Sequence, residues 1–372
     1  MMPQVITIKK SAEEGIKEFC KVLLQSKKVA GVLALTRKNR SAYYSLVTDP
    51  AKMDETTPLA PVMPANAATL LSRLTWEEGP PQPIAAVVRP CEERAFIERI
   101  KLQQGTFKNL YIISMTCGGV FPLKLLAQGE IENNLPQYYA SLNKAETVEN
   151  IRDVCKGCVH FIPCNADFTI DMLGRNNDSE CAMVVNTDRG EELIKGIEYS
   201  IEKRDTPLLR GHEDKKMKGL IEHREKVGEQ FYGEYHFGEP GMAGLSSALY
   251  KCVGCHSCSR ACPICYCNLC NFNSEQHDTR FSKFASQLRK SGSVRVPPDT
   301  MLFHIGRLNH VSISCVGCGM CEDVCPVNIP LGTLFSEISK ALQSIFDYVS
   351  GKNPDEDIPV STFEEEELTQ VQ

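Results

Sequence analysis

The chain has 372 residues, which is enough for two or three domains, and its formal net charge is −6. This acidic balance argues against a nucleic-acid partner, and no apolar run approaches the ~20 residues of a membrane span. No basic segment followed by an apolar core stands at the N-terminus. Together with 18 cysteines, this predicts a reducing, cytoplasmic compartment and metal ligation.

Residues 1–190 are predicted to form an α/β domain. Near-continuous apolar, β-rich runs are typical of strands buried on both faces, and helical stretches alternate with them. We therefore expect an open sheet covered by helices. The expected strands are 29–35, 42–48, 84–88, 110–115 and 182–187, and the expected helices are 13–26, 66–74 and 92–101.

Two of these strands run into cysteines, Cys91 and Cys117, and a C-x2-C pair follows at Cys155 and Cys158. Open α/β sheets bind ligands at the carboxyl ends of their strands. These four residues, called set 3 below, could therefore gather at one sheet edge and hold a cluster. Ligands scattered along a chain are weak evidence, and the alternative is that Cys91 and Cys117 are core residues.

Residues 191–247 are predicted to be a helical connector, with helices over 191–203 and 215–230 and a Gly-rich linker over 232–247. Residues 248–350 are expected to be a helix-rich dicluster ferredoxin-like domain. Its helices are expected over 278–289 and 299–309, with an amphipathic helix after Pro330. Residues 351–372 are expected to be a solvated acidic tail.

The motif C-x2-C-x2-C-x3-C-P occurs twice, and it is the motif with which bacterial-type ferredoxins hold a pair of [4Fe–4S] clusters. In that arrangement the fourth cysteine of each run binds the other cluster. Two ligand sets are therefore predicted, called set 1 and set 2 below. Set 1 is Cys252, Cys255, Cys258 and Cys325, and set 2 is Cys315, Cys318, Cys321 and Cys262.

Zinc sites use two separated ligand pairs, and disulfides do not persist in a reducing compartment, so both alternatives fit this repeat less well. Cys265, Cys267 and Cys270 follow the first run as CPICYCNLC. They could flank the first run, bind another centre or be packed thiols, and the pattern does not decide among these. His304 and His310 lie near the second run and are expected to be structural.

Residues 83–192 resemble the β subunit family of F420-reducing hydrogenases and F420-dependent formate dehydrogenases. The matching segments are RPCEERAFIERIKLQ, IISMTCGG and CKGCVHFIPCNADFTIDMLG, followed by VVNTDRGEELI. The C-terminal half looks like that of formate dehydrogenase-type β subunits, which append a helical ferredoxin to this core. The resemblance covers most of residues 60–345 and strengthens the prediction of a cluster at set 3.

This resemblance implies an iron–sulfur electron-transfer subunit of a larger oxidoreductase complex. FAD would exchange a hydride with the deazaflavin F420 and release single electrons to the clusters. The implied partner is the catalytic subunit of a formate dehydrogenase or hydrogenase, or heterodisulfide-reductase-like subunits. The implied exchange partner of the flavin is F420 or a nicotinamide, and the chain by itself is not expected to be a complete enzyme.

The N-terminus departs from the family. Where family members carry Ser-Gly-Gly before the first helix, this chain has KKSAEEGIKEFCKVLL, with Glu13 and Glu14 in place of the glycines. Carboxylates beside a pyrophosphate would repel it, and no G-x-G-x-x-G motif replaces the site. FAD therefore stays open, and two other functions remain, a pure cluster relay and an iron–sulfur sensor.

Overall fold

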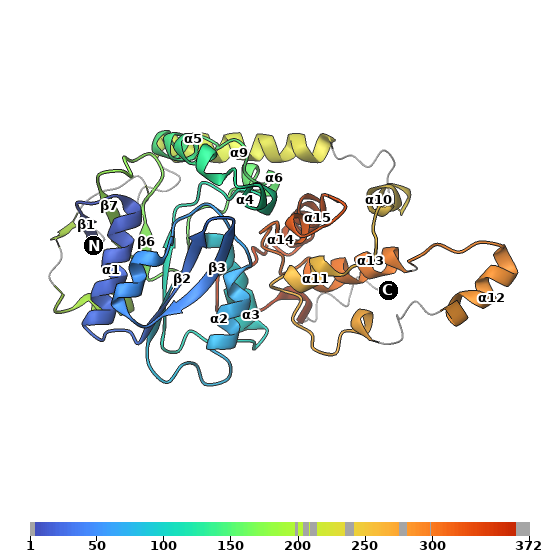
Figure 1. The fold of residues 1–372 in the computed structure, drawn as a ribbon, viewed down its shortest axis with the longest axis horizontal. Helices are drawn as coiled ribbons and strands as arrows, with labels where there is room; N and C mark the ends of the chain where they lie inside the picture. Colours follow the sequence, from blue (N-terminus) through green and yellow to red (C-terminus); the bar gives the residue numbers. More distant parts are fainter. Residues whose placement is uncertain are drawn as a thin grey trace.

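The computed structural model describes residues 4–197, 200–203, 208, 214–234, 242–274, 281–297 and 299–361. Its first half is built on one mixed sheet, with the described strands in the order β3-β2-β4-β5-β6-β7-β1-β8 (Figure 1). The strands are β1 Gln4–Ile8, β2 Gly31–Lys38, β3 Ser41–Val47, β4 Ile84–Val87, β5 Leu110–Met115, β6 Phe168–Ile170, β7 Cys181–Val185 and β8 Ser200–Lys203.

Strands β2, β4, β5 and β6 are parallel to one another, whereas β3, β7, β1 and β8 pair antiparallel with their neighbours. Side chains alternate between two apolar cores: Ala85 and Val87 of β4 enter one, and Ile84 and Ala86 enter the other. The sheet is thus covered on both faces, as parallel strands require.

Helices of the first half supply the covering layers. The first core contains α1, and the second contains α2 and α3. Ser11 caps α1 by accepting from the backbone N–H of Glu14, and Asn66 caps α2. The helical segments are α1 Ala12–Gln25, η1 Pro50–Glu55, α2 Ala67–Leu74, α3 Pro90–Lys101, α4 Leu123–Gln128, α5 Ile131–Lys144, α6 Asp153–Lys156 and α7 Asp188–Ile194.

The second half is helical in the residues that the structure describes. Helices α14 and α15 lie between the sheet and α13, while the long helix α9 contacts α6 and α15 (Figure 1). Its segments are α9 Lys215–Glu234, α10 Met242–Leu249, α11 Ser257–Ala261, η3 Asn271–Asn273, α12 Phe281–Ser291, α13 Thr300–Val311, α14 Met320–Asp323, α15 Leu331–Ile345 and η5 Pro359–Ser361.

The predicted fold class, an α/β core joined to a helix-rich C-terminal part, is confirmed. The helix predicted over 191–203 is wrong in its second half, because α7 ends at Ile194 and Ser200–Lys203 form strand β8. These residues pair with β1 at the edge of the sheet. A short edge strand shows little alternation of apolar and polar residues, so its sequence does not predict it. Strand β3 is also not buried on both faces; it is the edge strand, with alternating exposure.

The predicted Gly-rich linker over 232–247 contains helix at both ends, because α9 continues to Glu234 and α10 begins at Met242; residues 235–241 lie outside the described residues. Within the tail predicted over 351–372, residues 351–361 pack against the α/β core, and Ile358 is buried. No helix in the described ranges is long and apolar enough to cross a membrane.

Candidate metal centres

Set 1 is assembled from the loop before α11, from α11 itself and from the segment after α14. Its four cysteines line one small hollow together with His304 and Phe303. Burial, together with the other three thiols of the set, raises the pKa of Cys258 to about 11, against the lowering effect of Arg307. Backbone N–H groups point at two of the sulfurs: Gly254 N lies 3.5 Å from Cys252 Sγ, and Ile329 N lies 3.4 Å from Cys325 Sγ.

Set 2 is assembled in the same crossed manner. Burial raises the pKa of Cys321 well above its ordinary value, and the thiols of Cys262, Cys318 and Cys315 raise it further. Cys262 belongs to the first motif, so the fold does bring the fourth cysteine of one run to the first three of the other. Gly317 and Met320 donate backbone hydrogen bonds to Cys315 and Cys318.

Set 3 forms at the carboxyl ends of β4 and β5, which are parallel neighbours. Cys91 stands in the first turn of α3, and Cys117 follows β5. Burial, together with the thiols of Cys117 and Cys158, raises the pKa of Cys155 to about 12. Burial also raises the pKa of Cys91, to which Cys117 and Cys155 contribute. A backbone N–H also points at one of these sulfurs, because Gly119 N lies 3.3 Å from Cys117 Sγ.

These sets fit a cubane cluster in donor type and number, since each offers four thiols, and thiolate is the usual protein ligand of [4Fe–4S]. N–H groups directed at sulfur stabilise the negative charge that such a centre brings. Among the described residues, no group of three or more His, Cys, Asp or Glu side chains is close enough to hold a single metal ion.

The three sets are arranged in series. Cys91 of set 3 and Cys318 of set 2 pack against the same apolar residues, and the Cys318 thiol raises the pKa of Cys91 after the larger effect of burial. Sets 1 and 2 are joined through α11, which carries Cys258 and ends at Cys262. The series therefore runs from set 3 in the α/β core through set 2 to set 1.

In each set, one buried arginine donates a hydrogen bond to the carbonyl oxygen of a cysteine, and none of these arginines was identified from the sequence. Arg224 donates to the carbonyl oxygen of Cys158 at 3.1 Å, Arg152 donates to that of Cys318 at 3.1 Å, and Arg307 donates to that of Cys258 at 3.4 Å. The three side chains are at most 5% exposed. Each brings a fixed positive charge to a group of thiols, because a guanidinium does not lose its proton in a protein.

Two further arginines of α3 hold the two halves of the chain together. Arg99 donates to the carbonyl oxygen of Pro263, beside Cys262, and Arg94 donates to Ser350 O at 2.9 Å. The sequence signal for these contacts is the many charged residues of α3. In the structure, most of this helix is buried. Such a helix has to find polar partners on the element that covers it.

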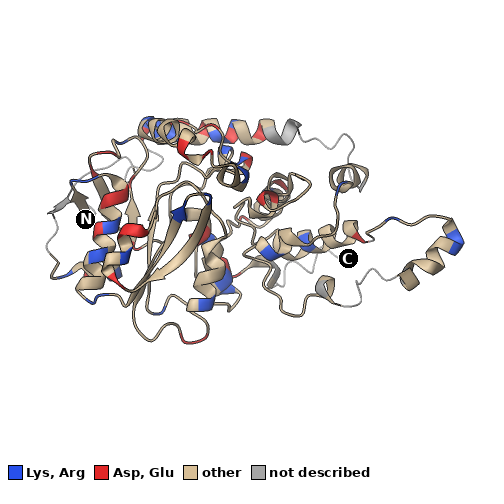
Figure 2. Cartoon of the chain, viewed as in Figure 1, with Lys and Arg blue, Asp and Glu red and all other residues tan. Residues whose placement is uncertain are grey.

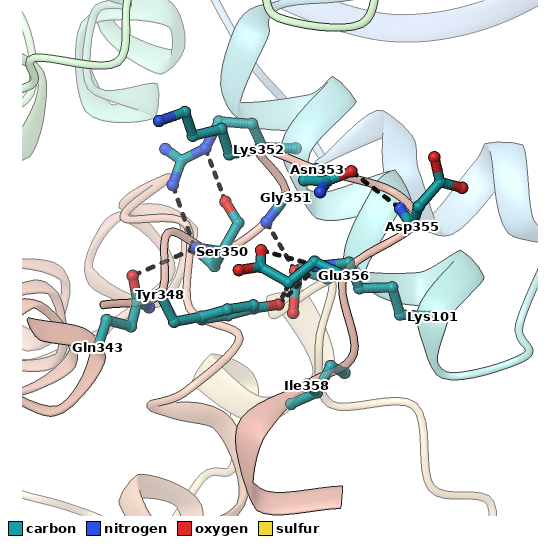
Figure 3. A network of polar contacts seen from close by, with 12 residues as sticks. Lys101, Gln343, Tyr348, Ser350, Gly351, Lys352, Asn353, Asp355, Glu356 and Ile358 are labelled. Carbon is teal, nitrogen blue, oxygen red and sulfur yellow. Dashed lines mark hydrogen bonds and ion pairs between the residues drawn. The ribbon is translucent and has the colours of Figure 1, made fainter. Parts of the chain in front are cut away.

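A polar network completes this junction (Figure 3). Glu98 of α3 accepts hydrogen bonds from Tyr348 Oη at 2.5 Å and from Gly351 N at 2.6 Å. Ser350 Oγ and Gln343 Nε2 both donate to the carbonyl oxygen of Cys315, at 2.9 and 3.0 Å. The network thus connects α3 directly to the loop that carries set 2.

The remaining cysteines behave differently. The Cys262 and Cys265 side chains are hydrogen-bonded, which lowers the pKa of Cys262 and raises that of Cys265. Cys265, Cys267 and Cys270 all line a cavity beside α13. His304 is structural in its contacts: it is buried, with Nε2 3.3 Å from Cys252 Sγ. His310 lines the same cavity as the three cysteines.

The first turn of α1 does not fit the phosphates of FAD. Two of its N–H donors are already bonded within the chain, Ala12 N to Asn177 O at 2.8 Å and Glu14 N to Ser11 Oγ at 3.3 Å. The Glu13 carboxylate accepts from Leu59 N at 3.0 Å, and burial raises its pKa to about 7. A phosphate here would meet an acidic side chain and donors that already have acceptors.

Comparisons with known proteins address the family of the chain. Residues 247–329 match the 4Fe-4S dicluster domain, which supports iron–sulfur clusters in the C-terminal part of the chain. The chain is 25% identical over 368 residues to the F420-dependent formate dehydrogenase subunit beta of Methanocaldococcus jannaschii, with 91% of each chain covered. It is 26% identical over 370 residues to the F420-dependent formate dehydrogenase 1 subunit beta of Methanococcus maripaludis, with 91% of this chain and 90% of that one covered.

The resemblance predicted from the sequence is thereby confirmed over nearly the whole chain. A solved chain from the F420-reducing [NiFe] hydrogenase complex of Methanosarcina barkeri is 15% identical, with a TM-score of 0.42, and the match covers 61% of this chain and 91% of that one.

Proposed function

We propose that this chain is the electron-relay subunit of an oxidoreductase complex and carries three [4Fe–4S] clusters, at sets 1, 2 and 3. The observation that carries the proposal is the serial arrangement, in which Cys91 lies beside Cys318 and α11 connects set 2 to set 1. When bound, such clusters take up and release single electrons. The chain supplies the thiols, the N–H donors and one buried arginine for each set.

The residues around the sets support a relay more than a sensor. A relay needs centres held at fixed separations in a dry interior. Here set 2 is clamped from two directions: Arg152 reaches Cys318 O from the α/β core, and Gln343 and Ser350 reach Cys315 O from the C-terminal segment. The buried arginines also offset the negative charge of neighbouring thiolates, which is costly in an apolar environment.

We further propose that the relay operates without FAD at the α1 end. The contacts of Glu13 and the bonded N–H groups of the first turn support this proposal. Acid extraction of the purified protein followed by flavin fluorescence tests it. We expect no flavin, and about one FAD per chain would overturn this part of the proposal while leaving the cluster relay intact.

The relatives named above are subunits, and this suggests that the chain works beside the catalytic subunit of a formate dehydrogenase or hydrogenase. Native purification under anaerobic conditions should recover such a subunit with this chain. A stable monomer that alone oxidises formate or hydrogen would contradict the proposal.

Iron content tests the relay most directly. We expect about twelve irons per fully loaded chain, four for each cluster. Replacing Cys155 and Cys158 together by serine should remove about four irons and leave those of sets 1 and 2. The control is Cys164→Ser, an exposed thiol outside the three sets, which should lose none. Unchanged iron in the double variant would exclude set 3 as a centre.

A further inference from the structure

The two ends of the series meet solvent very differently. Cys255 of set 1 is exposed, whereas no member of set 3 is. Tyr250 and Val253, which flank the first cysteine of set 1, are 64% and 48% exposed, and Val253 lines the same hollow as set 1. Set 1 is therefore the end of the series that another protein can approach.

A second exposed segment, residues 295–297, lies against the loop that carries Tyr250 and Val253. Arg295 Nη2 donates to Tyr250 O at 3.0 Å, and a Cβ added to Gly254 would meet Pro297 at 2.9 Å. Next to Pro297, Val296 is 68% exposed, and Leu302 at the start of α13 is 54% exposed. We call Tyr250, Val253, Val296 and Leu302 the set 1 face. Large apolar side chains gathered at one place on a surface mark an interaction site.

The stretch of sequence that contributes this face is richer in cations than in carboxylates. Between residues 250 and 300 the sequence holds seven Lys or Arg and three Asp or Glu, although the whole chain is acidic. The exposed charged residues that the structure describes in this stretch are five cations and one carboxylate, namely Lys251, Arg260, Arg289, Lys290, Arg295 and Asp299. Figure 2 shows the basic residues on α12 and near α11.

From these observations we infer that the set 1 face is the docking surface for an acidic, one-electron carrier protein or subunit. The inference rests on the proposed function and names the end of the relay at which electrons cross between proteins. Complementary charge steers such a partner, and the apolar residues exclude water where the two centres approach.

The experiment uses the cluster-loaded full chain and two probe carriers, an acidic [2Fe–2S] ferredoxin and a basic c-type cytochrome. Stopped-flow mixing measures the rate constant of electron exchange between 20 and 300 mM salt. Because the two carriers differ in driving force, the comparison is between the slopes of their rate constants against salt and not between the rate constants themselves. With the acidic carrier the rate should fall about tenfold over this range, and with the basic carrier it should stay level or rise.

Charge reversal locates the effect. Lys251→Glu with Arg295→Glu should slow exchange with the acidic ferredoxin about tenfold at low salt and flatten its salt dependence. The matched control, Lys108→Glu with Lys144→Glu, changes the net charge equally on the α/β half and should stay within twofold of the parent. Val296→Ser with Leu302→Ser should weaken exchange at high salt as well, since its effect is not electrostatic.

Several results would overturn the inference. One is equal slowing by the two charge-reversal pairs, and another is a rate with the acidic carrier that does not depend on salt. A dimer in sedimentation that dissociates on Leu302→Ser would assign the face to a second copy of the chain instead. Iron and the reduced EPR signal are measured on every variant, so a protein without clusters would refute the proposed function itself.

Discussion

Sets 3 and 1 each consist of four cysteine thiols, but set 3 is enclosed in the α/β core and set 1 lies partly at the surface. The ligands of set 3 are spread over 68 positions of sequence, from Cys91 to Cys158, and are brought together by parallel strands and short helices inside the α/β core. Three ligands of set 1 stand within seven positions, on a loop and one helical turn at the surface. A site built from sheet topology is enclosed by the layers that build it, whereas a site built from a contiguous motif can remain open on one side.

This difference suits the two ends of a relay. In the proposed relay, the enclosed end would exchange electrons through set 2 or through a partner that covers the α/β core. The open end can meet a partner directly. Set 2 lies between the two ends in the proposed relay, so a substitution in set 2 should have the largest effect on electron transfer between them.

The largest effect is expected from Cys318→Ser. It removes a ligand of set 2 and should slow electron transfer between the two ends at least a hundredfold, while the irons of sets 1 and 3 remain. Anaerobic iron analysis and stopped-flow reduction check this. The control is Cys267→Ser, at an exposed thiol outside the sets. Transfer at the parent rate in Cys318→Ser would mean that set 2 does not lie between the ends.

Gly351 lies at the junction between the two halves of the chain, and a substitution there should destabilise this junction. Its φ is +67°, and an added Cβ would lie 2.2 Å from Arg94 O, so Gly351→Ala combines backbone strain with a clash against the backbone of α3. We expect the free energy of unfolding to fall by about 2–4 kcal/mol in chemical denaturation. Gly196→Ala is the matched control, because Gly196 has φ +81° and nothing within 4 Å. Equal losses in the two variants would exclude the contact with α3 as the cause.

The α/β half should show its own pH dependence through Glu13. Its folded-state pKa is raised to about 7 from 4.5 by burial, so the folded chain holds this proton more tightly than the unfolded chain does. The stability that this proton provides is therefore full below pH 4.5 and is lost as the pH rises through 7. Glu13→Gln should be close to the parent at pH 5 and more stable than it by about 2 kcal/mol at pH 8.

Denaturant titrations of both proteins at the two pH values measure this difference. Glu132→Gln, at an exposed carboxyl of α5, should show no such change. A Glu13→Gln curve parallel to that of the parent from pH 5 to pH 8 would show that Glu13 titrates normally.

The smallest effect concerns the charge near the open end. Arg307 is buried, and its field reaches the thiols of Cys258 in set 1 and of Cys262 and Cys321 in set 2. Arg307→Met should lower the reduction potentials of both centres by on the order of tens of millivolts, since a buried cation favours the more negative, reduced state. Set 3 should be unaffected, and Arg295→Met, at an exposed side chain, should have less effect. A shift confined to set 3 in redox titration would contradict this assignment.

Much of this molecule follows from short-range sequence pattern. The spacing of the two cysteine runs predicts the crossed membership of sets 1 and 2, in which Cys262 belongs to set 2 and Cys325 to set 1. The apolar runs predicted β2, β4, β5 and β7, because a strand buried by helices on both faces leaves a continuous signal. Such features depend on residues a few positions apart, and the sequence contains them directly.

Other features were decided only by tertiary structure. Strands β1 and β8 exist through pairing across almost 200 residues, and neither has a strong pattern of its own. The place of Cys91 beside Cys318 depends on how the α/β core meets the dicluster part. The same holds for the arginines that fasten the sets: Arg152, Arg224 and Arg307 look like ordinary charged residues in the sequence. A buried charged side chain stabilises a fold only when the fold supplies it with acceptors, and for these arginines the acceptors come from distant parts of the chain.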